Sequence, residues 1–386
     1  MQERWRILGL LALAELMGMS VWLAASAVAP ALQLRWALDA AQAGWLTSAV
    51  QLGFVAGTLV AAVLNLADMV PSRWYFAVSA LLGAASNAAL LAVPGFAPAV
   101  GTRFLTGFFL AGVYPPAMKM AATWFVSGRG VAIGTIVGAL TVGKATPYLV
   151  DAFGGAEMRV VVLVTSTAAL LAAVLVAVGY HDGPHAFERR LFSWALVADV
   201  LRQRRWRLAT GGYLGHMWEL YCFWTWIAAY LAASGLGGDR VKLLAFAAIA
   251  VGGPACVWGG WVADRVGRER LVAWAMAVSG ACALGVGAVF DSTVALVLVT
   301  LVWGFFVIAD SAQFSALVTE VVPSHAVGTA LTLQTSLGFL LTTVTIQLVP
   351  AIAEADGWRW AFAVLAFGPA FGIAAIRRLR RLRAAD

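Results

Sequence analysis

Between two long apolar runs, at residues 260–270, the chain reads GWVADRVGRER. Gly267 permits the positive φ that a tight turn requires, because glycine has no Cβ. The arginines would hold such a turn in the headgroup layer on one side of a bilayer. The stretch therefore predicts a short basic turn that joins two membrane-spanning helices.

The apolar runs beside this turn belong to a series that extends along the chain. Of 386 residues, 62% are hydrophobic and 12% are charged, whereas a soluble domain carries about 25% charged residues. Crossing a hydrocarbon core of about 30 Å takes roughly 20 helical residues. We expect an all-α membrane protein with twelve spans, at 7–29, 42–66, 74–93, 98–122, 130–153, 158–180, 208–232, 241–262, 271–290, 293–318, 326–350 and 357–376. The first run contains Glu15 and has no cleavage pattern, so we interpret it as a retained helix.

The basic residues lie at alternate ends of the expected spans. Of 26 lysines and arginines, Arg103 and Lys144 fall deep inside spans. Of the other 24, which lie in loops or near span ends, 19 are on the side of the amino terminus. The remaining five are Arg35, Arg159, Arg240, Lys242 and Arg359. This positive-inside bias predicts that both termini are cytoplasmic, in a bacterial inner membrane. It also explains the net charge of +7 without nucleic-acid binding.

The longest polar stretch, 181–207, divides the spans into two groups of six. We expect an amino-terminal bundle at 1–180, a cytoplasmic linker at 181–207 and a carboxyl-terminal bundle at 208–386. The middle of the linker is apolar enough on one face to lie in the headgroup layer. Pairs at offsets of 196 to 204 indicate a parallel internal repeat: Glu15 with Glu219, Gly57 with Gly253, and Gly107 with Gly304.

Residues 260–270 closely resemble the G-x-x-x-D-R-x-G-R-[KR] signature of the major facilitator superfamily, at Gly260, Asp264, Arg265, Gly267 and Arg268. The resemblance implies two six-helix bundles related by a pseudo-two-fold axis, and a secondary transporter that is neither an enzyme nor dependent on a metal or cofactor. It also implies a functional monomer and a loop that latches neighbouring helices in the outward-open state. The alternative is a basic turn with no such role.

The matching loop after the second span, LNLADMVPSR at 64–73, keeps Asp68 but lacks the glycines and the first arginine of the signature. Arg103 and Gly107 resemble the family's R-x-x-x-G pattern in span four. Residues 134–143 resemble only partly the span-five motif of proton-coupled drug exporters, since Ala139 replaces the expected proline. The nitrate porters carry an asparagine- and glycine-rich signature in spans five and eleven. Neither GTIVGALTVG at 134–143 nor LTLQTSLGFL at 331–340 contains an asparagine, so nitrate is disfavoured as the substrate.

Several ionisable residues fall inside expected spans, where a charge at mid-bilayer costs about 2.5–3.5 kcal/mol. Glu15 and Glu219 lie near the midplane and are candidates for proton coupling, or for structural hydrogen bonds. His216 shares a helix face with Glu219 and could pair with it, or simply pack. We also assign Asp310 to proton coupling, and Arg103 to a structural or proton-relay role in which it snorkels or pairs with a carbonyl.

Lys144 is the expected substrate contact, because Gly143 and other small neighbours leave room for a ligand at its ammonium group. An anionic solute would keep the lysine charged; the alternative is an internal ion pair with Glu15 or Asp310. The other predicted substrate-binding residues are Trp22, His216, Tyr221, Trp224, Gln51 and Gln334.

The leading hypothesis is a proton-coupled symporter, in the lipid bilayer, for a small organic anion. A proton-antiport exporter of amphiphilic compounds is the alternative, favoured by the aromatic residues and opposed by the incomplete span-five motif. An enzyme is disfavoured because HExxH, GxSxG and metal-ligand spacings are absent from the sequence. A sensor that kept the fold without transport is a further alternative.

Overall fold

The computed structural model describes residues 2–125, 128–154, 157–185 and 193–384, and these residues form helices and turns but no strand. Of the expected linker, residues 186–192 lie outside the described part, Arg189 and Arg190 among them. In chain order the helices are α1 (Gln2–Met19), α2 (Ala24–Ala27), α3 (Ala29–Trp36), α4 (Ala40–Val63), α5 (Leu66–Met69), α6 (Ser72–Ala89), α7 (Phe96–Leu110), α8 (Tyr114–Trp124), α9 (Arg129–Phe153), α10 (Met158–Gly179), α11 (Trp194–Arg202), α12 (Arg204–Ala233), α13 (Asp239–Ala250), α14 (Gly252–Val266), α15 (Arg268–Gly285), η1 (Val286–Val289), α16 (Thr293–Ala309), α17 (Ser311–Val321), η2 (Ser324–Ala326), α18 (Val327–Asp356), η3 (Trp358–Ala366) and α19 (Phe367–Ala384).

By length and composition, nine stretches of the described residues could cross a membrane: Ala40–Val63, Phe96–Trp124, Gly130–Phe153, Met158–Gly179, Asp239–Val266, Arg268–Val289, Thr293–Val321, Val327–Asp356 and Trp358–Ala384. They coincide with nine of the twelve expected spans. The other three, at 7–29, 74–93 and 208–232, fall on the shorter or more polar helices α1, α6 and α12. For these three helices the span assignment stays a prediction.

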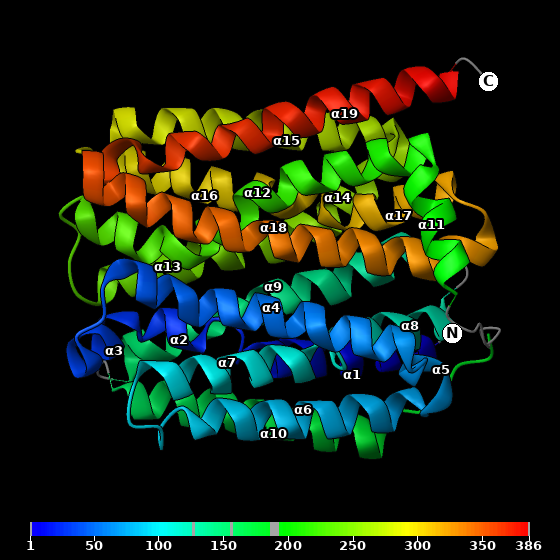
Figure 1. The fold of residues 1–386 in the computed structure, drawn as a ribbon, viewed down its shortest axis with the longest axis horizontal. Coiled ribbons are helices and arrows are strands. Elements are labelled where there is room, and N and C mark those ends of the chain that lie inside the picture. Colours follow the sequence, from blue (N-terminus) through cyan, green and yellow to red (C-terminus); the bar gives the residue numbers. More distant parts are fainter. Residues whose placement is uncertain (1, 126–127, 155–156, 186–192, 385–386) are drawn as a thin grey trace.

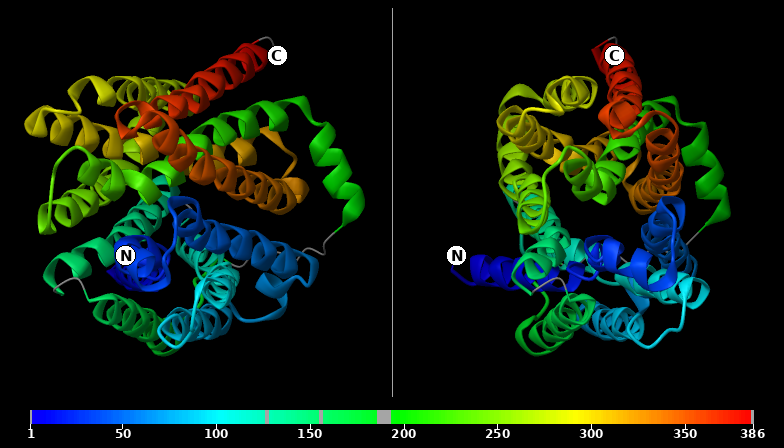
Figure 2. Two further views of the ribbon diagram at one scale, coloured as in Figure 1. Left: turned by 60° about the vertical axis from the view of Figure 1, so that its left-hand side comes forward. Right: turned by 90° about the vertical axis from the view of Figure 1, so that its left-hand side faces the viewer.

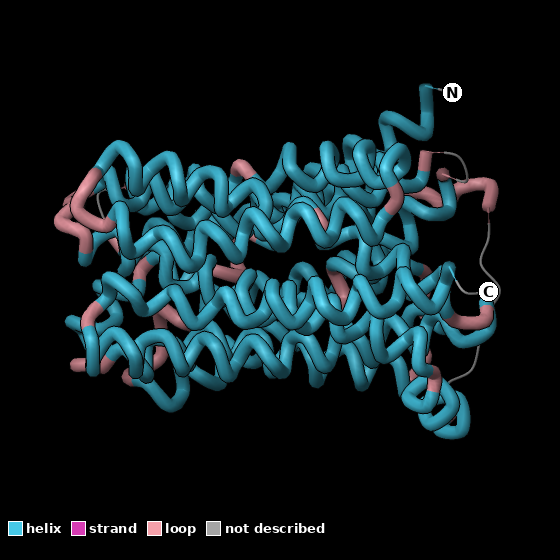
Figure 3. Tube along the Cα trace, turned by 90° about the horizontal axis from the view of Figure 1, so that it is seen from above, coloured by secondary structure: helices cyan, strands magenta, loops and turns pink. Residues whose placement is uncertain are grey.

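The helices lie in two groups that run side by side along the long axis of the molecule (Figures 1 and 2). Helices α1–α10 form the lower group in Figure 1 and α12–α19 the upper group, and most loops lie at the two ends of the long axis (Figure 3). Both termini and α11 lie at one end, which we call the terminal end. The opposite end, where α3 lies, is the distal end.

Where the two groups meet, α9 packs closely against α13 and α14, and α4 packs against α18. A Cβ added at Gly134 would lie 2.9 Å from the carbonyl oxygen of Cys256, and one at Gly138 would lie 2.6 Å from that of Gly253. Small residues of this kind let membrane helices approach through their backbones. The glycines of span five therefore join the two groups.

The expected repeat is visible in equivalent helix contacts. A Cβ at Gly107 of α7 would collide with the Val50 backbone of α4, and one at Gly304 of α16 would collide with the Ala248 carbonyl of α13. Gly57 and Gly253, which match in the sequence repeat, have different packing partners. Gly57 lies against α7 within its own group, whereas Gly253 lies against α9 of the other group.

The first span is not the single helix expected over 7–29. Helix α1 ends at Met19, and a turn at residues 20–23 leads into the short helices α2 and α3. The guanidinium of Arg103 donates from Nη2 to the carbonyls of Val21 and Trp22, at 3.0 and 2.5 Å. Carbonyls released by the break are thus satisfied by a charged donor from α7.

Candidate functional site

Lys144, on α9, is 1% exposed and lies among aromatic side chains from both groups of helices. Its Nζ donates a hydrogen bond to the hydroxyl of Tyr221 on α12. The same atom lies 3.8 Å from the centroid of the Trp22 ring and 5.5 Å from that of Trp224. Cation–π attraction from these faces offsets part of the cost of burying an ammonium group.

Further rings complete the wall around Lys144. The Trp22 ring lies 5.2 Å from Phe54 and 5.5 Å from Phe339, and Phe54 and Phe339 are 4.7 Å apart, centroid to centroid. These tilted pairs come from the turn after α1, from α4 and from α18, so the wall joins the two groups. Phe54 and Phe339 were not predicted, because single aromatic residues in apolar spans do not stand out.

A central cavity of about 50 Å³ lies beside Lys144. Of the predicted substrate contacts, Trp22, Lys144, Tyr221 and Trp224 line it, together with unpredicted residues such as Tyr114 and Tyr213. Ligand pockets usually measure about 300–1,000 Å³. In this conformation the side chains therefore close around the lysine, and a solute would need them to separate.

The two predicted glutamines lie apart from this cavity. Gln51 of α4 is fully buried, and both of its amide atoms lack a hydrogen-bond partner in the described structure. Gln334 of α18 is 2% exposed, and its Oε1 also lacks a partner there. Neither residue lines the central cavity.

The ion pair between Lys144 and a carboxylate, the alternative to a substrate contact, is not present among the described residues. Glu15 of α1 is fully buried, and neither of its carboxylate oxygens has a hydrogen-bond partner there. Glu15 does interact electrostatically with Lys144, without direct contact. Asp310 has a different neighbour, since its Oδ1 lies 2.9 Å from Nδ1 of His216. Lys144 is therefore a buried amino group with no carboxylate in contact.

Of the two alternatives for His216, pairing with Glu219 is not present among the described residues. Glu219 accepts hydrogen bonds from Trp303 Nε1 at 2.6 Å and from Ser279 Oγ at 2.9 Å. The two residues share a helix but differ in direction: Glu219 turns toward α15 and α16, whereas His216 meets Asp310 at the junction of α16 and α17. Side chains three positions apart on a helix point in similar but not identical directions. The helices that pack against each side chain therefore decide its hydrogen-bond partner.

Arg103 is fully buried and does not snorkel. Besides the two carbonyls of the broken first span, its Nη1 donates to Asn87 Oδ1 at 2.8 Å. Asn87 in turn donates from Nδ2 to Ser166 Oγ of α10 at 2.9 Å. The carbonyl pairing expected for Arg103 is thus present, and it ties α7 to α6 and to the turn after α1.

The basic turn at 260–270 lies where the two groups meet at the terminal end. A Cβ at Gly130, in the first turn of α9, would lie 3.3 Å from Oδ2 of Asp264, so this carboxylate faces the amino end of a helix from the other group. Gly267 has φ of 90°, as expected for the turn. Arg268 donates to Gln313 at 2.6 Å and to Glu320 at 2.7 Å, which ties the turn to α17.

The other predicted latch residues have local partners. Arg265 lies over the Trp261 ring, 3.4 Å from its centroid. A Cβ at Gly260 would lie 3.2 Å from the Gly130 carbonyl oxygen, so the glycine allows α14 to pack closely against α9. Asp68 accepts from Lys119 Nζ at 2.6 Å, a contact between α5 and α8 within one group.

An ion pair between the groups was also not predicted. At the distal end, Lys242 of α13 lies 3.2 Å from Oδ2 of Asp151 on α9. The two residues are 91 positions apart, and no sequence pattern links them.

A sequence model of the Major Facilitator Superfamily matches residues 10–346. The chain belongs to the major facilitator superfamily. It is accordingly a membrane transporter of small molecules and not an enzyme. No curated protein sequence matches the chain significantly.

This major facilitator is similar in fold to solved transporters. A bacterial homologue of the human lysosomal transporter Spinster, inward-facing and occupied, gives a TM-score of 0.77 at 14% identity, over 98% of this chain and 97% of that one. Its unoccupied form gives 0.74 at 15% identity, over 98% of both chains. A variant of the nucleoside transporter NupG gives 0.72 at 14% identity, over 97% of this chain and 98% of that one. At these identities the likeness concerns the fold alone.

Proposed function

We propose that this major facilitator carries a small organic anion across the membrane, with Lys144 as the group that attracts the anion. The observation that carries the proposal is the environment of that lysine: fully enclosed, faced by aromatic rings and without a carboxylate in contact. An anion entering between the rings would supply the counter-charge that the protein does not.

Transport would follow from rocking of two bundles, residues 1–180 and 208–386, about the central cavity, with the linker 181–207 between them. The contacts of α9 with α13 and α14, and of α4 with α18, supply the surfaces that would slide. We place both termini in the bacterial cytoplasm, on the basis of the charge bias, and take the monomer as the working unit.

Proton coupling is the second part of the proposal. Glu15 is buried without a hydrogen-bond partner in the described structure and interacts electrostatically with Lys144. A proton gained by Glu15 would therefore alter the charge around Lys144, the group that attracts the anion. In this scheme Glu219 is a further proton-carrying group. So are His216 and Asp310, which lie in contact with each other.

The test is flux into proteoliposomes under an imposed pH gradient, with substrates first selected by a thermal-shift screen of carboxylates, sugars, amino acids and dyes. Lys144→Met keeps most of the side-chain volume and removes the charge, whereas Lys144→Arg keeps the charge. We expect Met to abolish anion binding and Arg to retain part of it. Unchanged affinity of Lys144→Met for every anion would refute the proposal.

Export of amphiphilic compounds is a second candidate, and the ring cluster of Trp22, Phe54, Tyr221 and Phe339 favours it. Such compounds would bind chiefly through stacking and apolar contact. Phe54→Ala would then weaken binding more than Lys144→Met does. The opposite order would favour the anion, so the two variants distinguish the candidates.

A further inference from the structure

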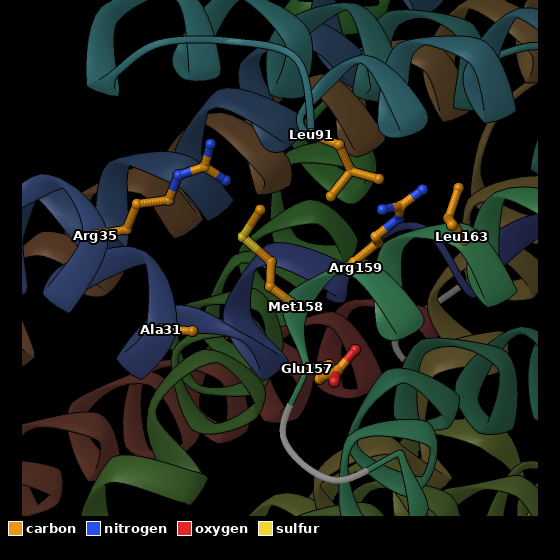
Figure 4. Close-up of a pocket in the computed structure, with 7 residues that line it drawn as sticks. All are labelled: Ala31, Arg35, Leu91, Glu157, Met158, Arg159 and Leu163. Atoms are coloured by element: carbon orange, nitrogen blue, oxygen red, sulfur yellow. The ribbon is translucent and has the colours of Figure 1, made fainter.

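A second cavity, of about 500 Å³, lies at the distal end of the lower group, away from the central site. Its lining comes from α3, from the turn after α6 and from the start of α10: Ala31, Arg35, Leu91, Glu157, Met158, Arg159 and Leu163. In Figure 4 the guanidinium groups of Arg35 and Arg159 lie to the left and to the right of Met158. Two cations thus share one cavity with an apolar wall.

Within the described residues, the charges of Arg35 and Arg159 are not balanced by ion pairs. Among the five basic residues expected on the distal side, Lys242 pairs with Asp151, and Arg359 pairs with Asp291. Within the described part of the chain, Arg35, Arg159 and Arg240 have no ion pair, and the first two line this cavity. Only Glu157 opposes them, which leaves a formal excess of one positive charge.

The start of α10 adds a second attraction for an anion. Glu157, its N-cap residue, makes no side-chain capping hydrogen bond. Helix α10 is 22 residues long, so its dipole and free first-turn amides favour negative charge at this end. The Arg159 side chain projects from the same turn.

The apolar side of the cavity continues along the membrane-facing surface of α10. Leu163 lines the cavity and is 42% exposed, and it begins a stripe of exposed side chains formed by Leu163, Leu170, Leu171, Val174 and Val178. From Leu163 to Val178 is 15 residues, or roughly 22 Å at about 1.5 Å per residue. That length exceeds half of a hydrocarbon core of about 30 Å. An acyl chain could therefore follow the stripe while its headgroup remains in the cavity.

We propose that this cavity binds an anionic phospholipid, with the phosphate between Arg35 and Arg159 and an acyl chain along the Leu163 stripe. A soluble phosphate would use the arginines but not the apolar wall. The site is separate from the central cavity, and binding there is measured without reference to transport.

The test uses the full-length protein in detergent and titrates dioctanoyl phosphatidylglycerol, with dioctanoyl phosphatidylcholine and glycerol phosphate as comparison ligands. We expect the double variant Arg35→Gln/Arg159→Gln to raise the Kd for phosphatidylglycerol about 25-fold, because each arginine near a lipid surface contributes a factor of about five. Arg240→Gln removes an exposed arginine expected on the same side and serves as the matched control, with unchanged affinity. Leu163→Asn should weaken binding of the lipid.

An equal Kd for the double variant and the Arg240→Gln control would overturn the proposal. So would equal binding of phosphatidylcholine, since charge would then not be recognised, or glycerol phosphate binding as tightly as the lipid, since the wall would then contribute nothing. If the double glutamine variant does not fold, Arg35→Lys/Arg159→Lys replaces it. That variant should retain binding within several-fold, and loss of binding in it would favour a role in folding over charge recognition.

Discussion

Lys242 of α13 contacts Asp151 of α9 twice, at 3.2 Å from Nζ to Oδ2 and at 3.2 Å from Nζ to the backbone carbonyl. The Asp151 side chain is only 7% exposed. At the terminal end of the same helix, Asp264 faces Gly130. An ion pair therefore joins α9 to the other group at its distal end, and the Asp264 carboxylate lies close to α9 at its terminal end. The ion pair would have to break for the distal end to open.

Asp151→Asn should favour opening of the distal end. The pair is stronger than an exposed one, which contributes about 0–1 kcal/mol, and weaker than a fully buried one at about 3–5 kcal/mol. A shift of roughly tenfold in the population of open molecules follows. Electron paramagnetic resonance distances between spin labels at Phe153 and Arg240 would measure it. Asp239→Asn removes the exposed partner of the same lysine and should have a smaller effect. An unchanged distance distribution in Asp151→Asn would contradict the prediction.

Glu15→Gln should reduce pH-gradient-driven uptake about tenfold or more while leaving exchange of labelled for unlabelled substrate intact. Glutamine keeps the shape of the side chain but cannot take up the proton that neutralises a buried carboxylate. Flux in proteoliposomes, with and without the gradient, measures both. Glu3→Gln, an exposed change on the same helix, is the control and should behave as wild type. Equal loss of uptake and exchange in Glu15→Gln would point to a structural role instead.

Arg103→Met should destabilise the protein by roughly 3–5 kcal/mol, because the carbonyls of Val21 and Trp22 would lose their charged donor within a buried network. Arg103→Lys should recover only part of this, since an ammonium group cannot reproduce the geometry of the guanidinium fork. Thermal unfolding followed by tryptophan fluorescence would rank the three proteins. A wild-type unfolding temperature in Arg103→Met would show that the turn after α1 does not depend on this arginine.

Gly107→Ala should cost about 1–3 kcal/mol or more, because the added Cβ collides with the Val50 backbone, which cannot move without displacing α4. Gly304→Ala should behave alike in the other group. Gly101→Ala, on the same helix as Gly107, has open space at the Cβ and should be neutral or stabilising by about 0.5–1 kcal/mol. Thermal unfolding would test all three, and similar temperatures for Gly101→Ala and Gly107→Ala would contradict the close packing.

Some contacts of the site followed from the sequence and others did not. A lysine between small residues in an apolar helix is easily recognised as a candidate site residue, because burying a charge is costly. Lys144 lies beside the central cavity. The sequence did not predict the roles of Phe54 and Phe339, or the partner of His216. Every span contains aromatic residues, and a helix turn of about 100° per residue leaves more than one neighbour open to a side chain.

The sequence by itself determined the helical membrane class and the superfamily, because apolar length and the basic turn at 260–270 are local features of the chain. Only the tertiary structure decided which buried charges meet. Glu219 bonds to Trp303, Asp310 lies beside His216, and Lys144 turns to aromatic rings. The physical reason is that a buried polar group must find its partner on whichever helix packs against it, and helix packing is a property of the whole assembly.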